Sequence, residues 1–262
     1  MSEVVTTDAG DRVAFDRYGS GPAIIFVSGA GPWRAMDPTT TRTAELLGER
    51  RVTAIVYDRI GRGESRAEGS LTLDREVSTL RALIAEVGGS AVLCGHSSGC
   101  SIALFAAAEG LPISALALWE APLGPQDGGG REWSAEVNRL IDAGDLRGAL
   151  MTYMHDMPPE ILEVVLSIPP MVDQAASLRA DGESLAWAES APHSELFSGI
   201  RVPVVAMLGE QSYDDVMVPA AESIVAAIPG AIWKRMPGAE HGWEPEPMAD
   251  ELADLVRLTT SR

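Results

Sequence analysis

The sequence predicts an α/β protein in which a mostly parallel sheet is flanked by helices and interrupted once by an inserted helical segment. Short runs rich in Val, Ile and Ala alternate with longer amphipathic segments along most of the 262 residues, which is typical of strand-helix-strand units. Residues 132–189 differ, because helical patterning continues there without a convincing strand. A chain of this length can bury one large core. We therefore expect a core formed by residues 1–123 and 190–262, with a helical insertion at residues 124–189.

The individual elements follow from local patterns. Apolar runs of strand length occupy residues 13–18, 23–27, 52–57, 91–94, 113–119, 202–208 and 231–236. Amphipathic segments of helical length occupy residues 39–49, 73–87 and 219–227, and a last helix follows Pro247. The sequence Gly-Ser-Gly-Pro at residues 19–22 is a strong turn signal, so we expect the first two strands to form an antiparallel pair. Two proline pairs, at residues 158–159 and 169–170, should divide the insertion into short helices.

The composition favours a small-molecule partner. The formal net charge of −18 at pH 7 opposes binding to phosphate backbones and to anionic membrane surfaces, so we expect neither a nucleic-acid nor a membrane partner. Residues 1–11 lack the basic and apolar regions of a secretory signal, and no apolar stretch approaches the length that spans a bilayer. These features predict a cytoplasmic protein, and nothing in the sequence indicates its oligomeric state.

The two cysteines, Cys94 and Cys100, are expected to be small buried thiols rather than a disulfide, because they fall on a strand and on the following helix. No spacing of cysteines and histidines suggests zinc. We therefore expect neither a metal nor a cofactor.

A strand-to-helix turn at residues 95–99, Gly-His-Ser-Ser-Gly, carries the most informative motif. Such a turn forces its central residue, Ser97, into a strained conformation and exposes the hydroxyl at the amino end of a helix, where backbone N–H groups favour negative charge. Glycines on either side let neighbouring elements approach closely. Ser97 is therefore a candidate nucleophile.

A serine nucleophile needs a base within hydrogen-bond reach. Of the four histidines, His96 lies on the same turn and should point away from the serine oxygen, whereas His155 and His193 fall at positions typical of solvated or packed side chains. His241 lies in a loop directly after the last predicted strand, at the sheet edge where sites form. We therefore assign His241 as the candidate base.

The oxyanion formed during acyl transfer needs two N–H donors. The backbone of Ser98, directly after the nucleophile, is one candidate. The second is expected from the Ser-Gly-Ala-Gly loop at residues 28–31, at Ala30, since this loop ends an apolar strand.

Together these features resemble the α/β-hydrolase superfamily, and more narrowly the compact serine esterase-like hydrolases with a helical cap. The resemblance covers nearly the whole chain. It rests on loop 28–31, the Ser97 turn, the late histidine, and residues 57–65, Tyr-Asp-Arg-Ile-Gly-Arg-Gly-Glu-Ser, which look like the family's D-x-x-G-x-G-x-S loop. We expect that last loop to buttress the sheet edge rather than to cradle a phosphate. Members often carry histidine at the position of Ser28, so support for the oxyanion loop should differ here.

The acid that orients the base is less obvious. The resemblance implies an acid three residues after Gly209, but that position is Ser212. Asp214 and Asp215 lie further along the same loop and would need a bulge to reach the base. Glu120 ends the strand after the serine turn, at the carboxyl edge of the sheet, and is the candidate we favour.

The resemblance implies a serine hydrolase that cleaves a carboxylic ester, lactone or thioester through an acyl-enzyme. Carbon–carbon hydrolysis and perhydrolysis remain open, since both can use the same residues. The methionines of the insertion suit a pocket for irregular apolar groups, so we expect a small or medium apolar substrate. The alternative, prompted by Ser212, is a non-hydrolytic member of the fold, either a biosynthetic cyclase or a small-molecule binder.

Overall fold

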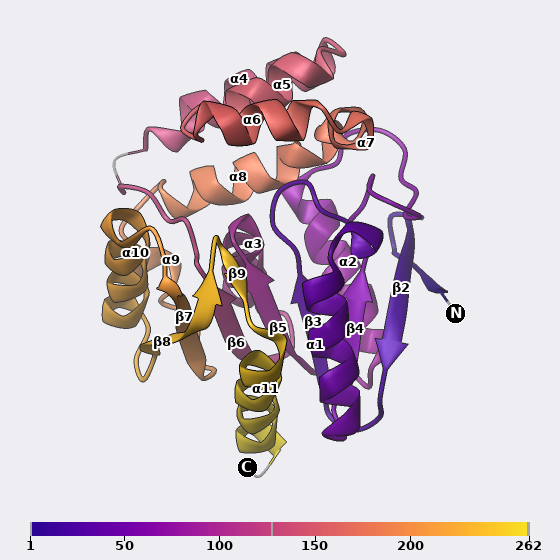
Figure 1. Cartoon of the computed structure of the whole chain (residues 1–262), viewed down its shortest axis with the longest axis vertical. Coiled ribbons are helices and arrows are strands. Elements are labelled where there is room, and N and C mark those ends of the chain that lie inside the picture. The colour runs from indigo at the N-terminus through magenta and orange to yellow at the C-terminus, as the bar shows by residue number, and fades with distance from the viewer. Residues whose placement is uncertain (1, 127, 261–262) are drawn as a thin grey trace.

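The fold is described from a computed structural model, which covers residues 2–126 and 128–260. In these residues one nine-stranded sheet has the order β1-β2-β4-β3-β5-β6-β7-β8-β9 (Figure 1). The strands are β1 (Glu3–Thr6), β2 (Arg12–Tyr18), β3 (Ala23–Val27), β4 (Thr53–Tyr57), β5 (Ala91–His96), β6 (Ile113–Trp119), β7 (Val204–Gln211), β8 (Ile232–Ala239) and β9 (Gly242–Trp243). Strands β3 to β8 are parallel, and β1, β2 and β9 are antiparallel to their neighbours. The predicted α/β class with a mostly parallel sheet is confirmed.

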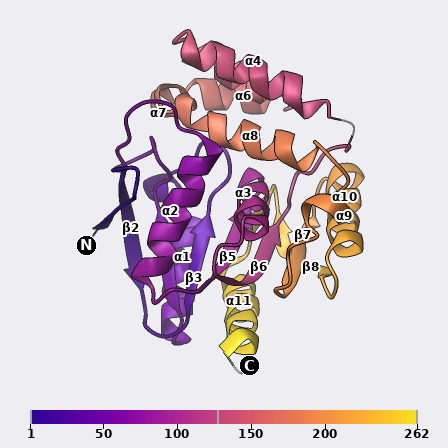
Figure 2. The same cartoon turned by 180° about the vertical axis from the view of Figure 1, so that it is seen from behind.

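Helices cover both faces of the sheet (Figures 1 and 2). One face packs against α1 (Pro38–Glu49) and α11 (Pro245–Thr260), and the other against α2 (Leu73–Glu86), α3 (Ser98–Ala108) and α10 (Asp214–Ala227). Successive strand residues alternate between the two cores. Val92 and Cys94 of β5 join one core, whereas Leu93 joins the other. Burial on both faces explains why these strands read as continuous apolar runs. Both cysteines are buried and unpaired.

The predicted antiparallel pairing of residues 13–18 with 23–27 is wrong. Strand β3 lies between β4 and β5 and is parallel to both, so neither of its edges is open to β2. Strand β2 pairs instead with the far edge of β4. The turn at residues 19–22 carries the chain close under the start of β4, because a Cβ placed on Gly21 would lie 2.2 Å from the carbonyl oxygen of Arg51. The glycines at residues 19 and 21 are therefore needed where this turn passes close to the backbone of residues 48–52, and they do not form a hairpin between β2 and β3.

A layer of helices lies over the carboxyl ends of the parallel strands (Figure 1). It comprises α4 (Gly130–Asp142), α5 (Leu146–Tyr153), α6 (Pro159–Leu166), α7 (Pro169–Asp173) and α8 (Leu178–Ala188), and short α9 (His193–Leu196) leads back to the sheet. Helices α6 and α7 begin at prolines, as the pairs in the sequence predicted, because proline fits the first helical position. Of the helices in the described residues, none is long and apolar enough to cross a bilayer.

Candidate active site

Ser97 lies in a strained turn between β5 and α3. Its φ of 53° and ψ of −130° place it outside the regions that a side chain normally allows. Its side chain makes no capping hydrogen bond to the backbone N–H groups at the start of α3. The flanking glycines are required by close approach. A Cβ on Gly95 would lie 2.7 Å from the Cα of Cys100, and a Cβ on Gly99 would lie 2.1 Å from the carbonyl oxygen of Val27.

His241 and Glu120 form a short hydrogen bond at the same edge of the sheet. His241 lies on the turn between β8 and β9, and Glu120 follows β6 directly. The two groups meet at 2.5 Å between His241 Nδ1 and Glu120 Oε2, and the other carboxylate oxygen accepts a hydrogen bond from Gly209 N at 3.0 Å. Burial alone would raise the pKa of Glu120, but the hydrogen bonds from His241 and Gly209 hold it below its ordinary value. A carboxylate that accepts from Nδ1–H leaves Nε2 of His241 free to take a proton.

His96 and Trp119 hold the backbone of His241. The Nε2–H of His96 and the Nε1–H of Trp119 both donate to the carbonyl oxygen of His241, at 2.9 and 3.1 Å. The His96 and His241 rings lie 4.7 Å apart between centroids, so the candidate base sits against the residue that precedes Ser97. Burial, and secondarily the charge of His241, lowers the pKa of His96 to about 4, so this imidazole is neutral at pH 7. Nothing in the sequence pattern pointed to this contact.

Backbone strain gathers at this site. Within the described residues, the non-glycine residues with positive φ are Arg51, Ser97, Glu120, Glu240 and His241. All except Arg51 belong to the three turns that meet at the site. Such conformations cost on the order of 1–3 kcal/mol each and persist where the surroundings over-determine them, which they typically do at functional sites.

The other candidate acids do not reach His241. Asp214 and Asp215 are exposed in the first turn of α10, and Asp214 pairs with Arg235 at 2.8 Å. Ser212 lies close enough to Glu120 to contribute to its lowered pKa, although its buried Oγ makes no hydrogen bond of good geometry. Of Asp214, Asp215 and Glu120, the three carboxylates considered from the sequence as the acid, the structure brings only Glu120 into a hydrogen bond with His241.

The remaining histidines lie elsewhere. His155 is exposed beside Asp156. His193 is buried; its Nε2–H donates to Ala188 O at 3.1 Å, and its Nδ1 accepts from the Ser223 hydroxyl at 2.6 Å. In this serine–histidine pair a backbone carbonyl accepts from the imidazole, whereas a carboxylate accepts from that of His241. Ser223 also lies inside α10 rather than at a helix amino end.

Loop 28–31 packs against the Ser97 turn. A Cβ on Gly29 would lie 2.9 Å from the Cβ of Ser97. Ala30 packs against an apolar cluster of the helical layer that includes Leu150 and Leu178, and Met171 of α7 lies over Gly31. The N–H of Ala30 makes no hydrogen bond to any described residue. The loop thus brings a backbone donor and apolar side chains next to the candidate nucleophile.

Comparisons with known proteins agree with this geometry. A family model described as alpha/beta hydrolase family matches residues 24–255. The chain belongs to the alpha/beta hydrolase family. Among solved structures, an alpha/beta hydrolase from Sphaerobacter thermophilus is 29% identical with a TM-score of 0.80, covering 97% of this chain and 99% of its own. No curated protein sequence matched.

More distant structures share the fold of this alpha/beta hydrolase. An enol-lactonase from Burkholderia xenovorans is 17% identical with a TM-score of 0.66, covering 99% of this chain and 100% of its own. A thermophilic esterase from Thermogutta terrifontis is 22% identical with a TM-score of 0.62, covering 100% of this chain and 96% of its own.

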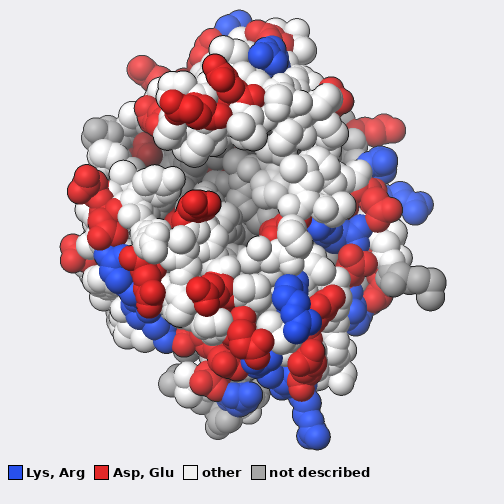
Figure 3. All heavy atoms as spheres, in the orientation of Figure 1, with Lys and Arg blue, Asp and Glu red and all other residues white. Residues whose placement is uncertain are grey.

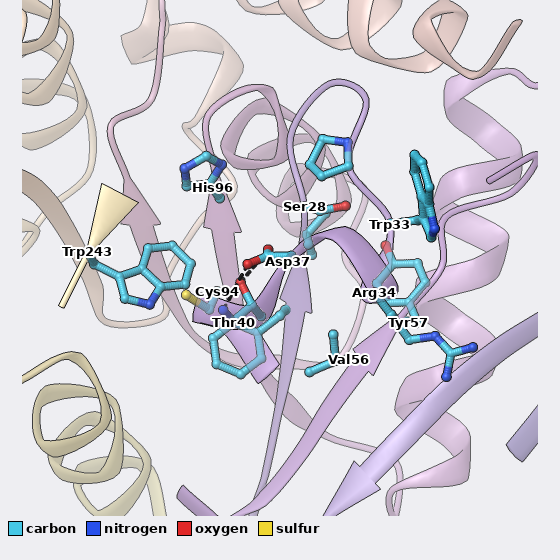
Figure 4. Close-up of a pocket in the computed structure, with 13 residues that line it drawn as sticks. Ser28, Trp33, Arg34, Asp37, Thr40, Val56, Tyr57, Cys94, His96 and Trp243 are labelled. Carbon is cyan, nitrogen blue, oxygen red and sulfur yellow. Dashed lines mark hydrogen bonds between the residues drawn. The ribbon is translucent and has the colours of Figure 1, made fainter. Parts of the chain in front are cut away.

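The surface of the alpha/beta hydrolase is hollowed below the helical layer (Figure 3). The walls of the hollow are largely uncharged, and acidic side chains lie above, to the left of and below it in this view. A pocket next to the Ser97 turn is lined by Ser28, Trp33, His96 and Trp243. Asp37 and Thr40, which are hydrogen-bonded to each other, also line it (Figure 4). Within residues 2–126 and 128–260, no group of three or more histidine, cysteine or acidic residues is arranged to hold a metal ion.

Proposed function

We propose that this alpha/beta hydrolase is a serine hydrolase that cleaves a carboxylic ester, lactone or thioester through an acyl-enzyme. Ser97 is the nucleophile, His241 the general base and Glu120 the carboxylate that orients it. The N–H groups of Ala30 and Ser98 form the oxyanion hole. The observation that carries the proposal is the 2.5 Å hydrogen bond between His241 and Glu120 beside the strained Ser97 turn.

The reaction follows from these positions. Ser97 Oγ attacks the carbonyl carbon while His241 Nε2 takes its proton, and the oxyanion is stabilised by the two N–H groups. His241 then gives the proton to the leaving oxygen or sulfur, which leaves an acyl group on Ser97. A water molecule attacks this ester with its proton passing to His241, the acid product departs and Ser97 recovers its proton. Glu120 stays ionised throughout and stabilises the imidazolium.

The surroundings support a small or medium apolar substrate. Ala30, next to the proposed nucleophile, packs against an apolar cluster of the helical layer that includes Leu150 and Leu178. The net charge of −18 favours neutral over anionic substrates in the surrounding field. Two structures of the same fold are named as an enol-lactonase and an esterase, which is consistent with this class. We also propose a cytoplasmic location, in keeping with two buried thiols.

The alternative, a non-hydrolytic member of the fold, was prompted by the serine at position 212. The hydrogen bond between Glu120 and His241 supports the hydrolase instead, because it gives the proposed base a carboxylate partner.

The proposal is tested by hydrolysis of p-nitrophenyl acetate, butyrate and octanoate. We expect turnover of all three, with the longer apolar acyl groups giving higher kcat/KM. Ser97→Ala should lower kcat by at least about 10⁴-fold. Ser223→Ala is the matched control, because the Ser223 hydroxyl is hydrogen-bonded to a different histidine, His193, and it should retain the wild-type rate. Equal rates for Ser97→Ala and the wild type would refute the proposal.

A further inference from the structure

A fully buried cluster of charges joins the helical layer to the sheet. Asp181 of α8 accepts hydrogen bonds from Arg59 at 2.6 Å and from Arg62 at 2.7 Å, and Arg59 also binds Glu76 of α2 at 2.9 Å. The side chains of all four residues are 0% exposed. Burying charges is costly unless they are paired and hydrogen-bonded. Since a buried ion pair adds little net stability, we expect this cluster to have a role besides stabilising the fold.

The cluster contacts both segments that supply the proposed oxyanion donors. Arg62 Nη1 donates to the carbonyl oxygen of Gly29 at 2.5 Å, and Arg59 Nη1 donates to that of Ser28 at 3.2 Å. On the other side, the hydroxyl of Ser98 donates to Asp181 Oδ1 at 2.7 Å. One carboxylate thus links the first residue of α3 to the arginines that hold loop 28–31.

Because the peptide group is planar, a hydrogen bond to its carbonyl also sets the direction of its N–H. The carbonyl of Gly29 and the N–H of Ala30 belong to one planar trans peptide and point in opposite directions. The hydrogen bond from Arg62 on the carbonyl side therefore fixes where the N–H of Ala30 points. The bond from Ser98 to Asp181 likewise restrains the start of α3, where the second N–H lies.

We infer that Asp181, a residue of the helical layer, is a positioning residue for the oxyanion hole, acting through Arg62 on Ala30 and through Ser98 on the start of α3. This inference rests on the proposed function. It makes α8 a fixed part of the catalytic centre rather than a lid that leaves it. Burial would raise the pKa of Asp181, but the two arginines keep it below its ordinary value, so the carboxylate stays charged.

The role of Asp181 can be tested with a substitution that leaves the buried charges in place. Asp181→Ala would leave the buried guanidinium groups of Arg59 and Arg62 without this carboxylate partner, which is expected to destabilise the fold strongly. Ser98→Ala removes the bond to Asp181, together with the contact of this hydroxyl with Tyr153, and keeps the backbone N–H proposed for the oxyanion hole. Ser184→Ala is the matched control, because Ser184 of α8 bonds Ser101 of α3 at 2.7 Å and the backbone oxygen of Asp181 at 2.9 Å, but bonds neither the Asp181 carboxylate nor loop 28–31 nor Ser98.

We expect Ser98→Ala to lower kcat for p-nitrophenyl butyrate about tenfold with KM within about twofold, because the donor is misaligned rather than lost. The rate of labelling by a fluorophosphonate should fall by the same factor, since its phosphorus centre also develops charge in the hole. Asp181→Asn, which keeps the shape of the side chain, should lower both rates at least as much. Ser184→Ala should change neither rate.

Two results would overturn the inference: Ser98→Ala and Asp181→Asn both folded and with wild-type kcat, or Ser184→Ala with the same loss as Ser98→Ala. In either case the proposed function stands if Ser97→Ala remains inactive. A wild-type protein that neither hydrolyses esters nor reacts with the fluorophosphonate would refute the proposed function, and the inference with it.

Discussion

The imidazole of His96 donates a hydrogen bond to the backbone carbonyl of His241 at 2.9 Å. Trp119 donates to the same oxygen at 3.1 Å. The residues directly before Ser97 and directly before Glu120 thus both hold the loop of the candidate base. His241 has a φ of 68°, a conformation that needs such support.

Replacing His96 should therefore impair catalysis without touching the reacting atoms. We expect His96→Ala to lower kcat about tenfold, because a small misplacement of the base is costly. His96→Gln can still donate from its amide nitrogen and should recover most of the rate. Steady-state hydrolysis of p-nitrophenyl butyrate measures both. A wild-type kcat in His96→Ala would show that the hydrogen bond is not needed to place the base.

His96 should also make the fold sensitive to acid. Burial lowers its pKa from 6.5 to about 4, so the unfolded chain binds a proton in this range that the folded chain does not. Stability is therefore lost as the pH falls from 6.5 towards 4, by about 3 kcal/mol in total. Urea unfolding at pH 7.5 and pH 4.5 should show that the wild type loses about 2 kcal/mol more than His96→Gln. Equal losses in the two proteins would contradict the buried, neutral state of His96.

Glu120→Gln should lower kcat by about 10³-fold or more, because an amide no longer holds His241 in the required tautomer. Asp214→Asn is the matched control, since Asp214 is exposed and pairs with Arg235 instead. It should stay within about twofold of the wild type, because exposed ion pairs contribute little. The reverse outcome, a large loss in Asp214→Asn and none in Glu120→Gln, would assign the acid to Asp214 in the first turn of α10.

Gly99→Ala should destabilise the protein by about 3 kcal/mol, because the added Cβ would lie 2.1 Å from the carbonyl oxygen of Val27. Gly199→Ala is the control. Its Cβ would have its nearest neighbour at 3.8 Å, and the expected change is within about 0.5 kcal/mol. Urea denaturation gives both values. If both variants were equally stable, the close approach of α3 to β3 would be wrong.

Local sequence signals predicted much of this arrangement. The Ser97 turn could be predicted because Gly95 and Gly99 are adjacent to the residue they serve. Glu120 could be preferred over Asp214 because a residue that ends a parallel strand lies at the edge where sites form. Both arguments need only a few neighbouring residues and the direction of a strand.

Long-range relationships could not be predicted in this way. The pairing of β2 depends on which sheet edges are free, and that is decided by β4 and β5, far along the chain. The contact of His96 with His241 joins residues 145 positions apart, and Asp181 lies 119 positions from Arg62. A buried carboxylate in an inserted helix looks like any surface carboxylate in the sequence, because burial is set by packing rather than by composition.

Covalent labelling by a fluorophosphonate, located by mass spectrometry, tests the central claim most directly. The wild type and Ser223→Ala should each gain one label, on Ser97, because the proposed mechanism gives Ser97 both a base and oxyanion donors. Ser97→Ala should gain none. A label on Ser223, a Ser97→Ala variant labelled at the wild-type rate, or a wild type that remains unlabelled would contradict the assignment of Ser97 as the nucleophile.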